Sequence, residues 1–244
     1  MKIAIAGKGG VGKTTVAAVL AEVLSKKFNV LAVDADASLN LMSVFGVEDI
    51  EPIVKMKDVV EERARLANGL VRMNPKVSDL IDEFSIPVNE NMKLLVSGTV
   101  ETAGSGCLCP ENSVLRALLQ ELVLKRGDAV IIDLEAGLEP MSRGTIKNID
   151  AILAVTEPVY NSITVTERLI KFAGELEVKN ALVVGNKIQS HNEKEYLSQN
   201  LDVFHFIPYD EEVREASMKE NFEIKDSRFY KSIEELAEKI ISLT

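Results

Sequence analysis

The sequence predicts a three-layer α/β fold with a mostly parallel central sheet and helices on both faces. Apolar, β-rich segments alternate along the chain with stretches whose apolar residues recur at helical spacing. At 129–132 every position is apolar, which is typical of a strand covered on both faces by helices. The strands predicted in this way are 2–6, 30–34, 93–96, 129–133, 152–156, 181–185 and 203–206.

Size and composition favour a single domain over residues 1–244. Hydrophobic residues make up 46% of the chain and charged residues 27%, an ordinary balance for a protein with a full-sized core. The segment 51–91 differs, with a charged helical candidate at 58–67, an Asn-Gly pair at 68–69 and further turn residues. We expect this segment to be a surface insertion within the one domain.

Composition also limits the partners. A net charge of −10 repels a phosphate backbone, so we expect no nucleic-acid partner. The longest apolar runs are of strand length, and the N-terminus lacks an export signal, which favours a cytoplasmic protein without a membrane span. The segment 229–244 has an apolar face, but its polar face is acidic-leaning. It is therefore predicted as a packing helix rather than a membrane anchor.

The strongest chemical motif follows the first strand. The sequence Gly-Lys-Gly-Gly-Val-Gly-Lys-Thr-Thr at 7–15 matches GxxxxGK[ST] between a strand and a helix, which predicts a P-loop NTPase fold. Glycines let the backbone close around phosphates, Lys13 reaches the β- and γ-phosphates, and Thr14 offers its hydroxyl to Mg²⁺. The nucleotide-binding residues predicted here are Gly9, Gly10, Val11, Gly12, Lys13, Thr14 and Thr15.

A second lysine, Lys8, lies inside the same loop. In this form the loop resembles the deviant Walker A motif of the MinD and ParA ATPases, the nitrogenase iron protein and the arsenite-pump ATPase. The resemblance implies that Lys8 reaches into the nucleotide site of a second subunit, so that ATP is held in a homodimer. The alternative is that Lys8 only adds positive charge beside the phosphates.

Two carboxylates follow the second predicted strand. By the same resemblance, Asp36 orients or deprotonates the attacking water, Asp34 lies in the outer shell of Mg²⁺, and Asn40 lies near the subunit contact in the first switch. A carboxylate at the carboxyl end of a parallel strand is well placed for such chemistry. A helix N-cap formed by Asp36 is the alternative.

The strand 129–133 ends in another carboxylate, Asp133. The segment 133–137 resembles the DxxxG second switch of these ATPases. The resemblance implies that Asp133 holds Mg²⁺ through water and that Gly137, with Glu135 beside it, senses the γ-phosphate. Loss of that phosphate would let the segment relax.

Adenine recognition is predicted at the ends of the last two strands. Relatives of the deviant Walker A type hold adenine with an asparagine and a proline-containing loop, which correspond here to Asn186 and to Pro208, Tyr209 and Asp210. A turn with Asp210 as a helix N-cap explains the second segment equally well.

The only two cysteines, Cys107 and Cys109, are separated by one residue, which chance spacing produces only about once in a hundred cases. Pro110 suits the first turn of a following helix, which would put Cys109 near its N-terminus, where thiol pKa values fall. Two subunits would supply four thiolates, enough for a bridging Ni²⁺ or Zn²⁺ ion. The alternatives are a pair of passive thiols or a strained disulfide.

Three segments together resemble the CooC family: the glycine-rich loop at 7–15, the Cys-Leu-Cys-Pro-Glu-Asn segment at 107–112 and the segment 133–145. The resemblance extends from Met1 to position 213. CooC proteins are ATPases that assist nickel insertion into carbon monoxide dehydrogenase. The resemblance implies an Mg²⁺-dependent ATP hydrolase, slow without its partner, with carbon monoxide dehydrogenase as the client. Ala37 and Ser38 depart from the Pro-Asn of many members. A MinD/ParA-like positioning ATPase and an iron–sulfur cluster carrier remain as alternatives.

Overall fold

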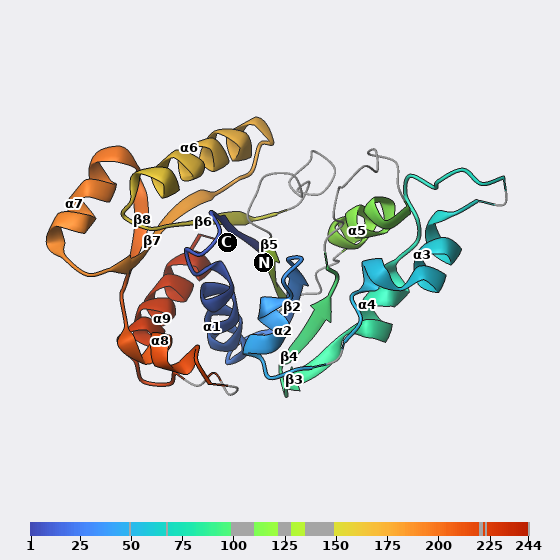
Figure 1. Ribbon diagram of the computed structural model, residues 1–244, viewed down its shortest axis with the longest axis horizontal. Coiled ribbons are helices and arrows are strands. Elements are labelled where there is room, and N and C mark those ends of the chain that lie inside the picture. The colour runs from blue at the N-terminus through green and yellow to red at the C-terminus, as the bar shows by residue number, and fades with distance from the viewer. Residues whose placement is uncertain are drawn as a thin grey trace.

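The central sheet has eight strands in the order β3-β4-β2-β5-β1-β6-β7-β8 (Figure 1). The computed structural model describes residues 1–48, 50–66, 68–98, 110–121, 128–134, 149–219, 222 and 224–243. All neighbouring strands run parallel except β3, which pairs antiparallel with β4 at one edge. The strands are β1 (Lys2–Gly7), β2 (Asn29–Ala35), β3 (Ile86–Asn89), β4 (Met92–Val96), β5 (Asp128–Leu134), β6 (Ala151–Thr156), β7 (Ala181–Ile188) and β8 (Val203–Pro208).

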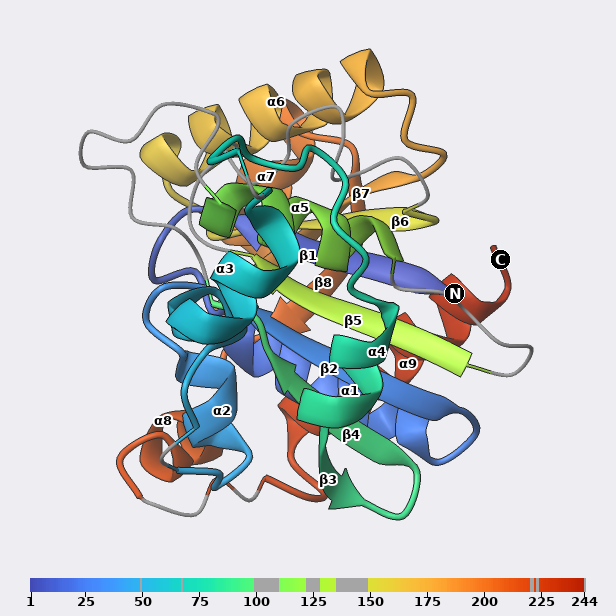
Figure 2. The same ribbon diagram turned by 90° about the vertical axis from the view of Figure 1, so that its right-hand side faces the viewer.

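Helices cover both faces of this sheet, as Figure 2 shows. Buried side chains of α1, α2, α8 and α9 form one core cluster with the strands, and those of α3, α4, α5 and α6 form the other. The helices are α1 (Lys13–Ser25), α2 (Asn40–Val44), α3 (Lys57–Ala64), α4 (Ser78–Phe84), α5 (Pro110–Glu121), α6 (Tyr160–Glu175), α7 (His191–Asn200), α8 (Glu211–Ala216) and α9 (Arg228–Ile241). The predicted three-layer α/β architecture is therefore confirmed.

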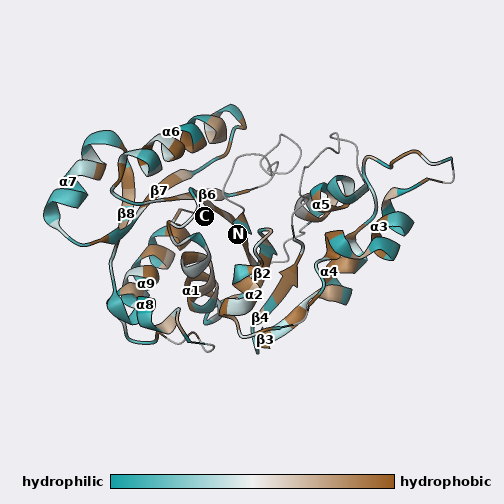
Figure 3. Ribbon diagram, viewed as in Figure 1, coloured by the Kyte–Doolittle hydropathy of each residue, from teal (hydrophilic) through white to brown (hydrophobic). Residues whose placement is uncertain are grey.

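Strand β1 shows why the sheet is buried on both sides. Successive side chains of a strand point to opposite faces, and here Ile3 and Ile5 join one cluster while Ala4 and Ala6 join the other. Figure 3 shows apolar colour along the central strands and polar colour on the outer surface of α7. Both faces of the strand therefore need apolar side chains, which explains the continuous apolar run from Ile3 to Ala6.

The segment 51–91, which was expected to be a surface insertion, also packs against the sheet. It contains a 3₁₀ turn at Ile53–Lys55, the helices α3 and α4, and the edge strand β3. Ile53, Val60 and Leu80 are almost fully buried against the sheet, so the segment contributes to the core. The helix predicted at 58–67 ends at Ala64, and Arg65 and Val71 form a short antiparallel bridge beyond it.

The last helix, α9, packs against α1, and its apolar residues face the core. Ile233, Leu236 and Ile240 are at most 1% exposed. The predicted role of this helix in packing agrees with that burial. Among the described residues, none of the helices has the length and apolarity needed to cross a bilayer.

Candidate nucleotide-binding and hydrolysis site

The loop between β1 and α1 is shaped by glycines that no other residue could replace without strain. Gly12, at the start of α1, has φ 93°, and a Cβ atom there would lie 2.6 Å from Asn186 Nδ2. Gly7 has φ 152°, and its Cβ atom would lie 2.3 Å from the carbonyl oxygen of Val155. The loop therefore lies against β6 and β7, at the carboxyl edge of the sheet where α/β proteins bind ligands.

Two side chains from β7 fix the backbone of this loop. The Asn186 amide donates to the carbonyl of Val11 at 2.8 Å, and the Lys187 ammonium donates to the carbonyl of Gly10 at 2.7 Å. Lys187 also forms an ion pair with Glu157, 2.5 Å away. The loop is thereby held in one arrangement before any nucleotide binds, which lowers the entropy cost of binding.

Two carboxylates lie next to each other behind the loop. Asp34 of β2 and Asp133 of β5 are paired in register on adjacent strands, and both side chains are fully buried. Burial raises the pKa of Asp34 to about 6, although amide hydrogen bonds from Met42 and Asp36 oppose the rise. Burial also raises the pKa of Asp133 to about 7; the Thr14 hydroxyl opposes this rise, and the charge of Asp34 adds to it.

The buried carboxylate of Asp133 forms no hydrogen bond of ordinary geometry in the described part of the chain, although the Thr14 hydroxyl is close enough to stabilise its charged form. Such a group is costly unless a cation or donor satisfies it. The predicted Mg²⁺-binding residues Thr14, Asp34 and Asp133 lie together here, and oxygen atoms are the ligands that Mg²⁺ prefers. These residues fit a divalent cation, which would neutralise charge on the phosphates and on this pair of carboxylates.

Two of the three predicted catalytic residues, Lys13 and Asp36, lie near these carboxylates. Lys13 is 6% exposed and close enough to Asp133 to stabilise its charged form. Asp36 is buried, and its Oδ1 atom accepts the backbone amide of Ser38 at 2.8 Å. The helix α2 begins at Asn40, and its N-cap residue is Leu39, so the alternative role of Asp36 as a helix N-cap is wrong. Lys8 and Asn40 are both exposed, as a contact with a second subunit would require.

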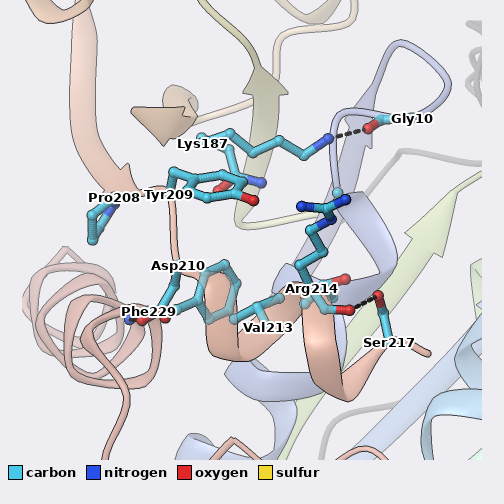
Figure 4. A pocket seen from close by; sticks show the side chains of 12 residues that line it. Gly10, Lys187, Pro208, Tyr209, Asp210, Val213, Arg214, Ser217 and Phe229 are labelled. Atoms are coloured by element: carbon cyan, nitrogen blue, oxygen red, sulfur yellow. Dashed lines mark hydrogen bonds between the residues drawn. The ribbon is translucent and has the colours of Figure 1, made fainter. Parts of the chain in front are cut away.

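A cavity of about 420 Å³ continues from the loop toward α8 (Figure 4). Its wall includes Gly10, Gly12 and Thr15 of the loop. A nucleotide whose phosphates are bound by the loop could therefore place its nucleoside in this cavity. All the residues predicted for adenine recognition line it as well: Asn186, Pro208, Tyr209 and Asp210. Sequence reasoning missed the lining residues on the helices α8 and α9, which include Val213, Arg214 and Phe229.

Asp210 has a structural role within this cavity. Its Oδ1 atom accepts the amide of Glu212 at 3.1 Å, which caps α8, and its Oδ2 atom accepts the amide of Phe229 at 3.0 Å. The carboxylate thus ties the start of α8 to the start of α9. The alternative prediction, that Asp210 is the N-cap of a helix, is therefore confirmed.

The comparison with known families agrees with this geometry. Residues 2–224 match the model of the CobQ/CobB/MinD/ParA nucleotide-binding domain. The chain belongs to this family. Because the match covers most of its length, this chain is a nucleotide-binding protein of the MinD/ParA ATPase type. It has the P-loop fold that the sequence predicted.

Three proteins that are similar to this chain agree with this assignment in sequence or in fold. An uncharacterized ATP-binding protein of Methanocaldococcus jannaschii is 42% identical over all of this chain and 98% of its own length. The carbon monoxide dehydrogenase accessory protein CooC of Rhodospirillum rubrum is 37% identical over 88% of this chain and 86% of its own. The crystal structure of the cell division ATPase MinD of Pyrococcus furiosus has the same fold, with a TM-score of 0.72 at 23% identity over 100% and 99% of the two chains.

Four predicted residues of this family member lie outside the described residues: Cys107, Cys109, Glu135 and Gly137. Lys187 was not predicted as a site residue, although its position in the sequence could have indicated it. It directly follows Asn186 at the end of a predicted strand, where functional side chains of parallel sheets gather.

The raised pKa of Asp133 predicts a pH-dependent stability. In the folded protein this group keeps a proton that the unfolded chain has already released, so unfolding releases a proton and is favoured as pH rises. Without nucleotide or divalent cations, we expect the proton on Asp133 alone to lower the free energy of unfolding by about 3 kcal/mol between pH 4 and pH 7. Denaturant unfolding measured across this range would show the slope.

Asp133→Asn should make that slope shallower, because asparagine does not titrate. Asp34 contributes a smaller slope of the same sign, since its pKa is also raised. Asp202→Asn, at an exposed aspartate, is the matched control and should leave the slope unchanged. An Asp133→Asn variant with the wild-type slope would contradict the assignment of this proton to Asp133.

Proposed function

We propose that this chain is an Mg²⁺-dependent ATP hydrolase that works as a homodimer and assists nickel insertion during the maturation of carbon monoxide dehydrogenase. The observation that carries the proposal is the Cys-Leu-Cys segment at 107–109, directly before α5, in a chain that also has a P-loop. The 37% identity with CooC of Rhodospirillum rubrum supports the same client. In cells such a protein would act in the cytoplasm.

The chain leaves the sheet beside the ATP site at Ser97 and Gly98, a few residues before the cysteines. β4 runs parallel to β2, and its last residue, Val96, is in register with Asp34. Beyond the strand, the amides of Ser97 and Gly98 both donate to the carbonyl of Asp34, at 3.0 and 3.1 Å. A change at Asp34 on nucleotide binding or hydrolysis would therefore be passed to the start of the segment 99–109.

The residues of the site suit hydrolysis in a dimer. Lys13 stabilises negative charge on the transferred phosphoryl group, and Asp36 orients the attacking water or accepts its proton. Exposed Lys8 reaches the site of the second subunit, so hydrolysis requires both chains. Mg²⁺ would supply charge neutralisation between the phosphates and the carboxylates of Asp34 and Asp133.

Ni²⁺ or Zn²⁺ would bridge the two subunits through Cys107 and Cys109 of each. Thiolates are good ligands for both ions, and four of them complete a closed site. Because a bridging site exists only in the dimer, metal binding and dimerisation favour each other. Opening of the dimer after hydrolysis would then release the metal to the client.

The likeness to MinD supports a second candidate, a positioning ATPase whose output is reversible binding to another surface. That function would not need the cysteines. It would also need an anchor, whereas the apolar face of α9 is buried in the core. The nickel-insertion function is therefore better supported.

The decisive experiment is metal-dependent dimerisation. Reduced, metal-free protein would be titrated with Ni²⁺ and with Zn²⁺, with and without ADP or ATP, and the mass followed by light scattering and the bound metal by elemental analysis. We expect about one metal ion per dimer, with binding altered by nucleotide. The double variant Cys107→Ser/Cys109→Ser should bind no bridging metal while keeping its ATP affinity. Equal metal binding and dimerisation by this variant would overturn the proposal.

A further inference from the structure

A second cavity, of about 560 Å³, lies beside the nucleotide cavity at the carboxyl ends of β7 and β8. Ile188, Phe206 and Pro208 give it an apolar wall, and the first turns of α7 and α9 form its sides. Pro208 also lines the nucleotide cavity, so the two cavities share the segment that joins β8 to α8. Its position at the end of parallel strands is one where α/β proteins commonly bind ligands.

The charge of this cavity is opposite to that of the whole protein. Lys194, Arg228 and Lys231 line it from two different helices, with His191 beside them, whereas Glu235 is its one acidic lining residue. The protein as a whole carries a net charge of −10. A local patch of cations attracts anions, even on a chain whose net charge is negative.

The three cations have no acidic partner in the described part of the chain. Lys194 lies 5.6 Å from the centre of the Phe206 ring, Arg228 donates to the carbonyl of Tyr209 at 3.4 Å, and Lys231 forms no ion pair there. Their charge is therefore available to a ligand.

The side chains, not the helix ends, would bind the ligand. Ser190 caps α7 by accepting the amide of Glu193, and Ser227 caps α9 by accepting the amide of Tyr230. Because these amides are occupied, recognition rests on the three cationic side chains and the apolar wall. Several cations in one cavity suit a multivalent anion, and the apolar wall suits the carbon part of a small molecule.

We propose that this cavity binds a small multivalent organic anion, with phosphate or carboxylate groups on Lys194, Arg228 and Lys231 and its carbon skeleton against Phe206 and Pro208. The volume is within the range of small-molecule sites, roughly 300–1,000 Å³. The proposal is independent of the metal and the client enzyme proposed above. It adds a second ligand site to an ATPase whose nucleotide cavity lies on the other side of Pro208.

The test uses the full chain saturated with ADP, so that the phosphate-binding loop is already occupied. Inorganic pyrophosphate is titrated by calorimetry without divalent cations, and citrate is titrated separately to compare phosphate with carboxylate. We expect one equivalent of at least one probe to bind. The variant Lys194→Gln/Lys231→Gln should bind it about tenfold or more weakly, since both cations are lost.

A matched control is Lys171→Gln/Lys179→Gln, which removes the same charge from exposed positions in and after α6. It should bind the probe as the wild type does. Both variants should keep wild-type affinity for ADP, because none of these lysines lines the nucleotide cavity. Equal probe binding by all three proteins, or no binding by the ADP-saturated wild type, would overturn the proposal.

Discussion

Replacement of Lys13 by glutamine is expected to reduce ATP hydrolysis by about 10²–10³-fold, the usual effect of removing one charge-stabilising group from a transition state. Lys13 is the only buried lysine at the loop, and it faces a group of carboxylates that includes Asp34 and Asp133 among the described residues. Without its charge, both the phosphates and these carboxylates lose a compensating cation. Steady-state phosphate release, measured with saturating ATP and Mg²⁺, would report the loss.

Lys27→Gln is the matched control for this variant. Lys27 is exposed just beyond the last turn of the same helix, so the change in charge is the same but the site is far away. Its hydrolysis rate should equal that of the wild type. A Lys13→Gln variant that retained more than about a tenth of the wild-type rate would contradict a role for Lys13 in the transition state.

The central strands could be predicted because each is buried on both faces and therefore apolar throughout. The edge strand β3 could not, because it is four residues long, contains Pro87 and alternates between half-buried and exposed positions. Helix α2 has only five residues and no side-chain cap, so it leaves little periodic signal. The packing of 51–91 onto the sheet was also hidden, because it depends on a few separated apolar residues such as Ile53 and Leu80.

The nucleotide site was predictable where its residues are adjacent in sequence or follow strands. The loop at 7–15, Asp34, Asp133 and Asn186 all have this property, and the structure brings them to one edge of the sheet. Val213, Arg214 and Phe229 have no motif around them and reach the cavity only through the packing of α8 and α9. The same holds for Lys194 and Arg228, which are far apart in the chain and become neighbours around one cavity.

The reach of Lys8 into a second subunit can be tested with two inactive variants. Lys8→Ala should reduce hydrolysis because the opposite site loses its second lysine, and Asp36→Asn should reduce it because its own site loses the group that orients water. We expect each effect to be about 10²-fold or larger. Asp36 belongs to the site of its own chain, since its charge acts on both Asp34 and Asp133.

Mixing the two variants in equal amounts should restore activity. In a mixed dimer, the site on the Lys8→Ala chain has its own Asp36 and receives Lys8 from the Asp36→Asn chain, so one of the two sites is intact. If subunits exchange freely, half of the dimers are mixed and the mixture should reach about a quarter of the wild-type rate. If Lys8 acted only within its own chain, each site would lack one group and the mixture would remain as inactive as its components. Chemical crosslinking of a mixed sample in which the two variants carry tags of different mass would establish that mixed dimers had formed, so an inactive mixture would rule out the cross-subunit role of Lys8.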